Sequence, residues 1–573
     1  MVGGVLAAGA VPGAYAAAPA ASAAAPQLTA ARAIPGLNAL NAGGTARVTS
    51  VSCGTAGNCA AVGSYTDASG NLLPFVADEK NGTWGNAREL ALETRATNVK
   101  AELLSVSCAA AGNCSAVGYS GADGLPVAFT VSETNGTWGP AQVIPGINGQ
   151  ESEAGSVSCP AAGTCAADGF VVTGGAVEPF TVAQANGTWG TASVVPGVAA
   201  LNVGKNAGAT NISCAAPGSC AAAGVYSDVN DDLPSWVAST AANGSWNPAL
   251  PEPGISGGGL REIGAPPQIT VSCGAPGNCA AAGWTDTNAT RTRTSFVLNE
   301  VNSAWGAPRD VPGLAALTGT GGFSRITAVS CKSAGNCTVT GQFSTSLRGT
   351  KAFAVSEVNG TWGNALEIPG IAALGGGTDA ASASAVSCAT AGNCAAGGVY
   401  DDSTPAEHVF VAVQAGGAWG NAQQLTGTGT RPTLSSASCA TPGNCAFGGS
   451  STDASGHLQG FVADLSAGVG APGQIQTTTS VALSAATVTF GREQAGQIAV
   501  TVTAASGGAP RGVVTVTANK ATVCLIVLGS GTGSCRLTPK GLRPGTYALT
   551  ARFFGGLGFA GSASAPATLT VTR

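Results

Sequence analysis

Short runs in which apolar and small polar residues alternate recur along most of the chain. Before a cysteine, segments such as ARVTSVSC and ITAVSC place an apolar residue at every second position, and a similar run follows the next cysteine, as in CAAVGSYTD. A third run, such as PFVADEKNG, leads through Asn-Gly into a fourth run that opens with TWG. Alternation with a period of two predicts β-strands, and Asn-Gly between two such runs predicts a tight hairpin. Each cycle therefore predicts four short antiparallel strands, with no helical segment between them.

The four-strand cycle occurs eight times. Its marker, which reads VSCGTAGNCAAVG at Val51–Gly63, returns every 51 to 59 residues. A four-stranded unit repeated at this interval is typical of a β-propeller, in which each unit forms one blade around a common axis. The pattern therefore predicts an all-β protein with an eight-bladed β-propeller of four-stranded antiparallel blades.

The 18 cysteines all fall into local pairs. The predicted disulfides join Cys53 to Cys59, Cys108 to Cys114, Cys159 to Cys165, Cys214 to Cys220, Cys273 to Cys279, Cys331 to Cys337, Cys388 to Cys394, Cys439 to Cys445 and Cys524 to Cys535. Facing positions across a hairpin need only a modest adjustment to accept such a bridge. The alternative is zinc held by a tetrathiolate shared between two repeats, although the five-residue gap is longer than zinc motifs favour. Local disulfides throughout the chain predict an oxidising compartment and a secreted protein.

The combination of SC-x5-C, a following aromatic residue and NGTWG resembles a repeat of secreted actinobacterial proteins. The resemblance covers about Ala30–Ile475 and implies a propeller of the kelch and galactose-oxidase-like class. Near the C-terminus, PRGVVTVTA, GLRPGTYALTARFFG and SAPATLTVT resemble bacterial immunoglobulin-like domains. Alternating Val and Thr over about 100 residues independently favours a β-sandwich there, and we expect Cys524 and Cys535 to fix one of its hairpins.

Three segments follow from these patterns. Residues 1–29 resemble the later part of a signal peptide, with a disordered Ala/Pro leader as the alternative; residues 30–475 form the propeller; residues 476–573 form the Ig-like sandwich. The segment AARAIPGL (Ala30–Leu37) resembles the end of a fourth run and is a candidate for the outer strand of the last blade. The other candidate for that place is VGAPGQI (Val469–Ile475).

The aromatic residues keep step with the repeats. Trp opens the fourth run in seven repeats, and an aromatic residue near the end of the second run is usually followed by another ten positions later, as in Tyr65 and Phe75. Such regular rings could serve as platforms for sugars. We interpret them as packing within and between blades, because a binding site needs asymmetry and a core does not.

Charge and composition exclude several partners. Charged residues make up 9% of the chain, the formal net charge is −5, and no basic block occurs, so electrostatic attraction to nucleic acid has no visible source. No apolar run is long enough to predict a membrane span. No phosphate- or dinucleotide-binding glycine motif accompanies the 86 glycines, and we expect no cofactor and no resident metal. We expect a monomer.

Sequence variation among the repeats is confined to the loops between the second and third strands and to those between repeats. We expect these loops to form the ligand-contacting face. The residues that we assign to it are Glu151, Glu153, Asp228, Asp232, Arg261 and Asp401. Asp228-x-Asn230-x-Asp232 has the oxygen spacing of a calcium loop but lacks its Gly and distal Glu, so an Asx turn is the simpler interpretation. Asp168 stands at a strand position that is apolar in neighbouring repeats, and is either internally hydrogen-bonded or functional.

Two histidines on distant loops do not build a catalytic triad, and we assign no catalytic residue. The leading hypothesis is a secreted binding or adhesion protein for a glycan or an extracellular protein, free in the medium or associated with the cell wall. The alternatives are a secreted polysaccharide hydrolase or lyase that uses loop carboxylates, and a passive structural component of the cell envelope.

Overall fold

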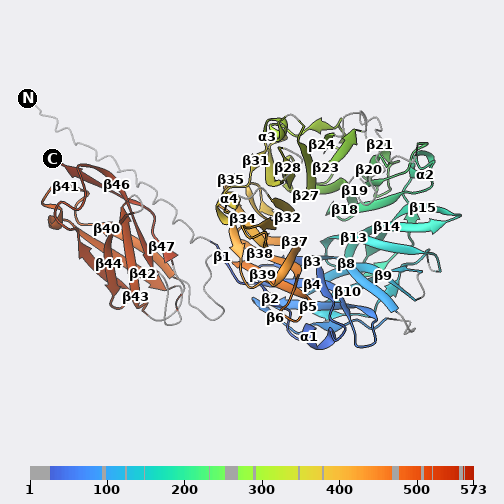
Figure 1. Cartoon of the computed structure of the whole chain (residues 1–573), viewed down its shortest axis with the longest axis horizontal. Coiled ribbons are helices and arrows are strands. Elements are labelled where there is room, and N and C mark those ends of the chain that lie inside the picture. Colours follow the sequence, from blue (N-terminus) through green and yellow to red (C-terminus); the bar gives the residue numbers. More distant parts are fainter. Residues whose placement is uncertain are drawn as a thin grey trace, which may run out of the picture. The chain divides into compact units, whose positions relative to one another are not determined.

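The computed structural model is almost entirely β-structure and divides into two compact units (Figure 1). It describes residues 26–92, 99–122, 125–147, 149–230, 233–251, 269–287, 292–319, 321–345, 349–376, 380–466, 477–504, 509–518, 521–553, 559 and 562–573. The first unit comprises Pro26–Ser466, and the second includes the described residues from Thr477 onward.

Each of the eight repeats contributes three long antiparallel strands to the first unit. The first strands are β3 (Ala46–Thr55), β8 (Val99–Ala110), β13 (Ser152–Ala161), β18 (Gly208–Ala216), β22 (Ile269–Ala275), β27 (Phe323–Ser333), β32 (Ala381–Thr390) and β37 (Thr430–Thr441). The second strands are β4 (Asn58–Thr66), β9 (Asn113–Ala122), β14 (Thr164–Thr173), β19 (Ser219–Val225), β23 (Asn278–Thr287), β28 (Asn336–Ser344), β33 (Asn393–Asp401) and β38 (Asn444–Thr452). The third strands are β5 (Leu72–Lys80), β10 (Val127–Thr134), β15 (Ala176–Ala185), β20 (Ser235–Ser239), β24 (Thr292–Val301), β29 (Lys351–Val358), β34 (Glu407–Ala415) and β39 (Leu458–Ser466).

The fourth run differs from the single strand that the sequence predicts, because most repeats divide it into two short pieces that both pair with the third strand. Gly, Asn, Pro and Ala, which are weak strand formers, separate the pieces. The pieces are β6 (Thr83–Trp84) and β7 (Arg88–Glu89), β11 (Thr137–Trp138) and β12 (Gln142–Val143), β16 (Thr188–Trp189) and β17 (Ser193–Val194), β25 (Ala304–Trp305) and β26 (Arg309–Asp310), β30 (Thr361–Trp362) and β31 (Leu366–Glu367), and β35 (Ala418–Trp419) and β36 (Gln423–Leu425), with β21 (Leu250–Pro251) in the fourth repeat.

Short helices were not predicted but occur in four connections between repeats within the described residues. They are α1 (Leu37–Leu40), α2 (Val198–Leu201), α3 (Leu314–Thr318) and α4 (Ile371–Leu374). Each follows a Pro-Gly pair whose glycine adopts a left-handed conformation, as at Gly36 with φ 74°, and its first residue is buried. One turn is too short to give a periodic apolar pattern, which explains the omission.

Identical hydrogen bonds join the first strands of successive repeats. The serine before each first cysteine accepts a bond from the backbone N–H of the first cysteine in the next repeat, as from Cys108 to Ser52 at 2.9 Å. The same bond occurs at all eight junctions. The eighth of these bonds runs from Cys53 to Ser438 at 2.9 Å, and so returns from the last repeat to the first. These serines are therefore the acceptors that link neighbouring repeats.

The N-terminal segment completes the outer side of the last repeat. Strands β1 (Gln27–Leu28) and β2 (Arg32–Ala33) pair with β39 in the positions that the two pieces of the fourth run occupy elsewhere. The repeat unit therefore begins before the expected boundary at residue 30. The competing segment, Val469–Ile475, lies outside the described residues.

Aromatic side chains pack inside and between the repeats, as expected. The third-strand aromatic stands opposite a second-strand glycine in every repeat, as Phe75 does opposite Gly63. A Cβ atom at Gly63 would lie 1.9 Å from the carbonyl oxygen of Arg47, so only glycine fits beneath the ring. Indole N–H groups cross to the preceding repeat, as from Trp138 to Asp78 at 2.8 Å and from Trp84 to Asp464 at 3.3 Å.

The second unit is a two-sheet sandwich. One sheet has the order β40 (Thr477–Leu483), β42 (Gln497–Ala504) and β45 (Thr532–Arg536). The other has the order β41 (Thr487–Thr489), β48 (Ala567–Thr572), β46 (Gly545–Phe553), β43 (Gly512–Ala518) and β44 (Ala521–Leu528), with β47 (Ser562–Ala563) beside β46 and the short helix η1 (Glu493–Ala495) outside the sheets. Val500, Val514, Leu549 and Phe553 are among its fully buried core residues. The bridge between Cys524 and Cys535 joins the two sheets rather than the paired strands of one hairpin, which corrects that expectation.

Candidate functional site

Charged side chains gather at one end of the first strands. The position six residues before the first cysteine carries Arg47, Glu102, Glu153, Gly208, Arg325, Ser382 and Thr433 in the repeats where it is described. The Cys N–H-to-Ser hydrogen bonds set the same relative position for neighbouring first strands. The residues six positions before the first cysteine therefore lie at the same height along the strands. We call this level and its neighbouring loops the loop end, and the side with the disulfide turns the cysteine end.

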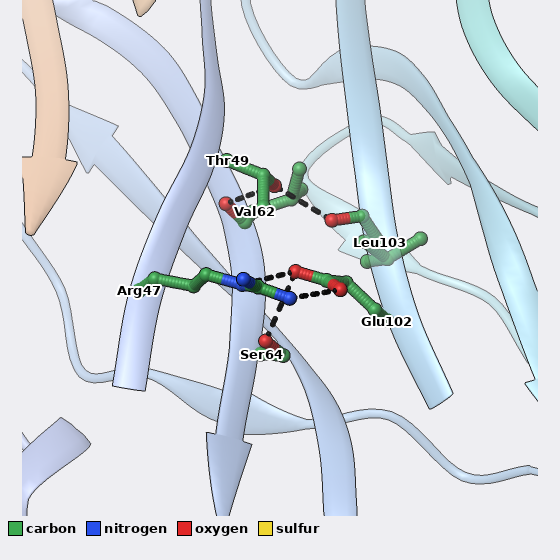
Figure 2. Close-up of polar contacts among 6 residues, drawn as sticks. All are labelled: Arg47, Thr49, Val62, Ser64, Glu102 and Leu103. Carbon is green, nitrogen blue, oxygen red and sulfur yellow. Dashed lines mark hydrogen bonds and ion pairs between the residues drawn. The ribbon is translucent and has the colours of Figure 1, made fainter. Parts of the chain in front are cut away.

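Arg47 and Glu102 form the centre of a polar cluster at the loop end (Figure 2). Nε and one terminal nitrogen of Arg47 each donate to a different oxygen of the Glu102 carboxylate at 2.6 Å, and the hydroxyl of Ser64 donates to the same group at 3.1 Å. Glu102 is 2% exposed, whereas nearly half of the Arg47 side chain is exposed. The hydrogen bond to Glu102 raises the pKa of Arg47. The buried carboxylate is thus held by a two-pronged ion pair between adjacent repeats.

A bulge in every first strand except β22, whose start lies outside the described residues, fixes the direction of these side chains. In the first repeat the strand register shifts between Val48 and Ser50, so Thr49 stands out of the ladder. Its hydroxyl lies 3.1 Å from the carbonyl oxygen of Val62 and 2.6 Å from that of Leu103 in the next repeat (Figure 2). Thr327 makes the equivalent contacts in the sixth repeat, to Thr340 and Ala383, so the backbone is the same there.

Tyr119 of the second repeat and Glu153 of the third repeat extend the cluster. Burial raises the pKa of Glu153, and the neighbouring charge of Glu102 raises it further. Burial also raises the pKa of Tyr119, with Glu102 and Glu153 adding to the effect and Arg47 opposing it. The arrangement combines an ion-paired carboxylate, a carboxyl group that holds its proton more tightly than usual, and a phenol. Such groups can bind polar ligands and can exchange protons with them.

A second cluster at the loop end is cationic. The guanidinium carbons of Arg325 and Arg293 lie 5.0 and 5.4 Å from the ring centroid of Trp284. Burial lowers the pKa of Arg325, and the like charge of Arg293 lowers it further. This cluster joins the fifth and sixth repeats, on strands β23, β24 and β27.

The seventh repeat places a histidine near the start of its third strand, β34. His408 Nε2 lies 2.9 Å from Asp402, and its Nδ1 lies 3.1 Å from the amide nitrogen of Gln424. Asp402 also accepts a hydrogen bond from the hydroxyl of Thr404. The hydrogen bonds to Asp402 lower its pKa, and the bond from Thr404 has the largest effect. The contacts order a short loop of the kind that Asx residues form.

The residues assigned to the ligand face from the sequence are not gathered into one site. Glu153 belongs to the cluster around Glu102, and Glu151 is exposed in the loop just before it. Asp228 accepts a hydrogen bond from the backbone of Asn230 at 2.7 Å, as in an Asx turn. Asp401 ends β33 in register with Glu407. Asp232 and Arg261 lie outside the described residues.

Sequence comparison of the repeats overlooked Glu102 and interpreted Tyr119 only as packing. An alignment of the eight repeats on their first cysteine would have singled out Glu102. The position six residues before that cysteine is charged in several repeats whose first strands are otherwise mostly uncharged. The grouping around it needed the tertiary structure, since Arg47, Glu102 and Glu153 come from three different repeats.

Asp168 is fully buried in the third repeat, and neither carboxyl oxygen has a hydrogen-bond partner that meets normal geometry. Burial raises its pKa well above the ordinary value, and the backbone N–H groups of Ser156 and Asp168 offset only part of this effect. It faces Thr181 across the strand pair. Asp168 is therefore a buried carboxyl group that holds its proton more tightly than usual.

The cysteines form the nine predicted disulfides, with none left free. In the repeats each bridge joins residues of the first hairpin whose Cα atoms lie 3.9 to 4.0 Å apart, which removes the shared zinc tetrathiolate as an interpretation. The described part of the chain contains no group of three or more potential metal ligands. None of its helices has the length and apolarity to cross a membrane.

Comparison with known proteins identifies the C-terminal unit. Residues 480–572 match the family model of the bacterial Ig-like domain (group 3). The protein therefore carries a C-terminal bacterial Ig-like domain. No curated protein matches the sequence.

Solved structures resemble the chain only distantly. A protein of unknown function from Dyadobacter fermentans is 10% identical, with a TM-score of 0.33, and the match covers 77% of this chain and 99% of that one. The PL25 ulvan lyase, a polysaccharide lyase, is 10% identical with a TM-score of 0.38 and coverage of 76% and 95%. NanB sialidase from Streptococcus pneumoniae, in a mutant form, is 10% identical with a TM-score of 0.30 and coverage of 74% and 68%. Similarity at this level carries no argument about function.

Proposed function

We propose that this protein is a secreted binding protein whose eight repeats form an eight-bladed β-propeller and whose loop end contacts a glycan or an extracellular protein. The Ig-like domain would act as an accessory module.

Three contacts between the first and last repeats support the propeller. The Cys53-to-Ser438 bond is the same as the bonds at the other seven junctions. The indole of Trp84 reaches Asp464, and Val48 and Val51 pack in one apolar cluster with Ala446 and Val462. Strands β1 and β2 occupy the outer edge of the last sheet. Each repeat then has a neighbour on both sides, as closure requires.

The disulfides support secretion. Nine bridges with no free cysteine suit an oxidising compartment, and they would not persist in a reducing cytosol. Each bridge in the repeats closes a short loop and fixes the first hairpin of its sheet.

The observation that carries the binding function is the concentration of charge at the loop end. Only 9% of the chain is charged, yet four first strands carry Arg or Glu near their start, at the same level. The turns at the cysteine end have nearly the same sequence in every repeat. This uniformity favours a structural role for that end over ligand recognition. Charged groups on one level of four first strands can contact a polar ligand from several directions.

The test is binding by the intact, oxidised protein to arrays of bacterial and host glycans and to extracellular proteins. We expect a ligand whose affinity falls in the Arg47→Met and Glu153→Gln variants. Lys80→Gln, which removes an exposed charge at the cysteine end, is the matched control and should leave binding unchanged. Equal effects of all three variants, or no ligand at all, would contradict the proposal and favour a passive envelope component.

A second candidate function is supported by the raised pKa values of Glu153 and Tyr119 beside Glu102. These are the side chains that a polysaccharide hydrolase or lyase would use to exchange protons with its substrate. An oligosaccharide panel assayed for new reducing ends and unsaturated products tests this candidate. Turnover that disappears in Glu153→Gln and Tyr119→Phe would establish it, and an inert panel would remove it.

A further inference from the structure

A row of buried polar side chains lies where each third strand reaches the cysteine end. The position is four residues after the third-strand aromatic, and it holds Glu or Gln in six of the eight repeats, namely Glu79, Glu133, Gln184, Glu300, Glu357 and Gln414. The disulfide turns beside this row are nearly uniform in sequence, but the contacts that the row makes with the preceding repeat differ from one junction to the next.

At two junctions the glutamine supplies the hydrogen bonds. Nε2 of Gln184 donates to the hydroxyl of Ser132 in the preceding repeat at 3.0 Å, and to the carbonyl of Gly187 in its own turn at 3.3 Å. Gln414 in the seventh repeat makes the same two bonds. A nitrogen donor therefore occupies an equivalent place at both junctions.

A third junction has a glutamate in the row, and there the preceding repeat supplies the donor. Asn299 of the fifth repeat accepts from the indole N–H of Trp362 at 3.0 Å through its oxygen, and donates through Nδ2 to Glu357. Each of these three junctions thus has one N–H group between the two facing side chains.

The junction between the first and second repeats lacks that donor on the side of the first repeat. Asp78 stands where Asn299 stands, and it accepts from the indole N–H of Trp138 in the same way, at 2.8 Å. Its other carboxylate oxygen pairs with the exposed guanidinium of Arg88 at 2.9 Å. A carboxylate offers the neighbouring repeat acceptors only, where an asparagine offers an N–H.

The side of the second repeat supplies no donor either. Glu133 is 4% exposed, and among the described residues its carboxyl group forms neither a hydrogen bond nor an ion pair. It lines a cleft of about 280 Å³ together with Asp78, Gly136 and the exposed Lys80. The volume is close to the lower end of the range for small-molecule sites. A buried acceptor without a partner costs free energy that a bound donor recovers.

We propose that the cleft between the first two repeats binds the primary ammonium group of a small amine, which donates to Glu133, to Asp78 and to the carbonyl oxygen of Gly136. The three N–H bonds of an ammonium group match three acceptors, two of them charged. A metal ion matches less well, because the described residues contain no group of three or more His, Cys, Asp or Glu side chains that could hold one. The cleft is at the cysteine end, so this inference does not rest on the proposed role of the loop end.

The experiment titrates the full-length oxidised protein with n-butylammonium at pH 8 and follows binding by calorimetry and by the NMR signal of the Trp138 indole N–H. We expect binding, and a shift of that signal, because the indole donates to Asp78. The matched probes are n-butanol, which has no charge, and tetramethylammonium, which has no N–H. Comparison of 6-amino-6-deoxyglucose with glucose tests whether an amino sugar is a better ligand than an aliphatic amine.

Two variants supply the missing donor from the protein itself. Glu133→Gln copies the junctions that contain a glutamine, and Asp78→Asn copies the junction that contains Asn299. Each should weaken binding of n-butylammonium at least about tenfold, the loss typical of a charge-assisted hydrogen bond. Glu357→Gln removes a carboxyl group from the same row at a junction that already has its donor, so its affinity should stay within about twofold of the wild type. Lys80→Gln should strengthen binding, because it removes a like charge from the cleft.

Several outcomes would overturn the site. These are no amine bound, equal affinity for tetramethylammonium or calcium, unchanged affinity in Glu133→Gln, or weaker binding in Lys80→Gln. A glycan or protein ligand whose binding Arg47→Met weakens, found together with no response of the Trp138 signal to any amine, would refute this inference and leave the proposed function intact.

Discussion

The pH dependence of stability tests how neighbouring repeats are held together at the cysteine end. Glu79 and Glu133 occupy equivalent third-strand positions and line a cleft of about 280 Å³ between the first two repeats. Each is 4% exposed. The pKa of Glu133 is raised from its ordinary 4.5 to about 7, chiefly by burial and then by the charge of Asp78, while Lys80 and Arg88 oppose the shift.

Glutamine in the same position shows what a neutral side chain does there. Gln184 in the third repeat donates through Nε2 to the hydroxyl of Ser132 at 3.0 Å and to the carbonyl of Gly187 at 3.3 Å. The corresponding acceptors for the second repeat are Asp78 and Gly136. An ionised Glu133 cannot donate to either of them, whereas a glutamine can.

The magnitude follows from the pKa shift. A rise from 4.5 to about 7 corresponds to roughly 3 kcal/mol, and solvent in the open cleft reduces this to about 1–2 kcal/mol. Because the folded protein binds this proton more tightly than the unfolded chain, stability decreases as pH rises from about 4.5, and the decrease is complete above about 7. Glu133→Gln should therefore stabilise the protein by about 1–2 kcal/mol at pH 8 and hardly at all near pH 4.

The assay is calorimetric unfolding of the oxidised protein across this pH range, with the transition of the repeat unit followed separately from that of the Ig-like domain. Gln184→Glu is the reciprocal control and should destabilise the protein at pH 8 but not at pH 4. A gain for Glu133→Gln that is the same at both pH values, or a loss at pH 8, would refute the reasoning, because the effect would then come from packing and not from the buried charge.

Three further predictions concern the frame of the repeats. Replacing Cys53 and Cys59 together by serine should lower the unfolding free energy by roughly 2 kcal/mol, the chain-entropy value for so short a loop, as measured by denaturant titration; an unchanged midpoint would mean that the bridge does not constrain the unfolded chain. Asp168→Val should raise the melting temperature at neutral pH and have less effect at acidic pH, because it removes a buried carboxyl group with a raised pKa; a lower melting temperature would show that the carboxyl makes a stabilising contact. Ser52→Ala should cost about 1–2 kcal/mol by leaving the N–H of Cys108 unpaired, and amide hydrogen exchange at Cys108 should become faster; unaltered exchange would argue against the link between repeats.

The local structure follows from the sequence because its determinants are local. Alternation of apolar residues, Asn-Gly turns and cysteines six positions apart specify hairpins and bridges within a few residues of each other. The Val- and Thr-rich runs after residue 476 specify the Ig-like domain in the same way. The one-turn helices and the division of the fourth run into two pieces were not predicted, because these elements are too short to show a periodic pattern of apolar residues.

The site depends on contacts between repeats, which no local pattern encodes. Arg47 forms an ion pair with Glu102 of the next repeat, whereas Arg325 lies over the ring of Trp284. The difference follows from the residue at the equivalent position of the next repeat, which is Glu102 in one case and Ser382 in the other. The sequence by itself determined the strands, the disulfides and the apolar cores of the repeats. Only the tertiary structure decided which charged side chains form ion pairs. Residues about 55 positions apart become neighbours because the Cys N–H-to-Ser hydrogen bonds align equivalent strands of adjacent repeats.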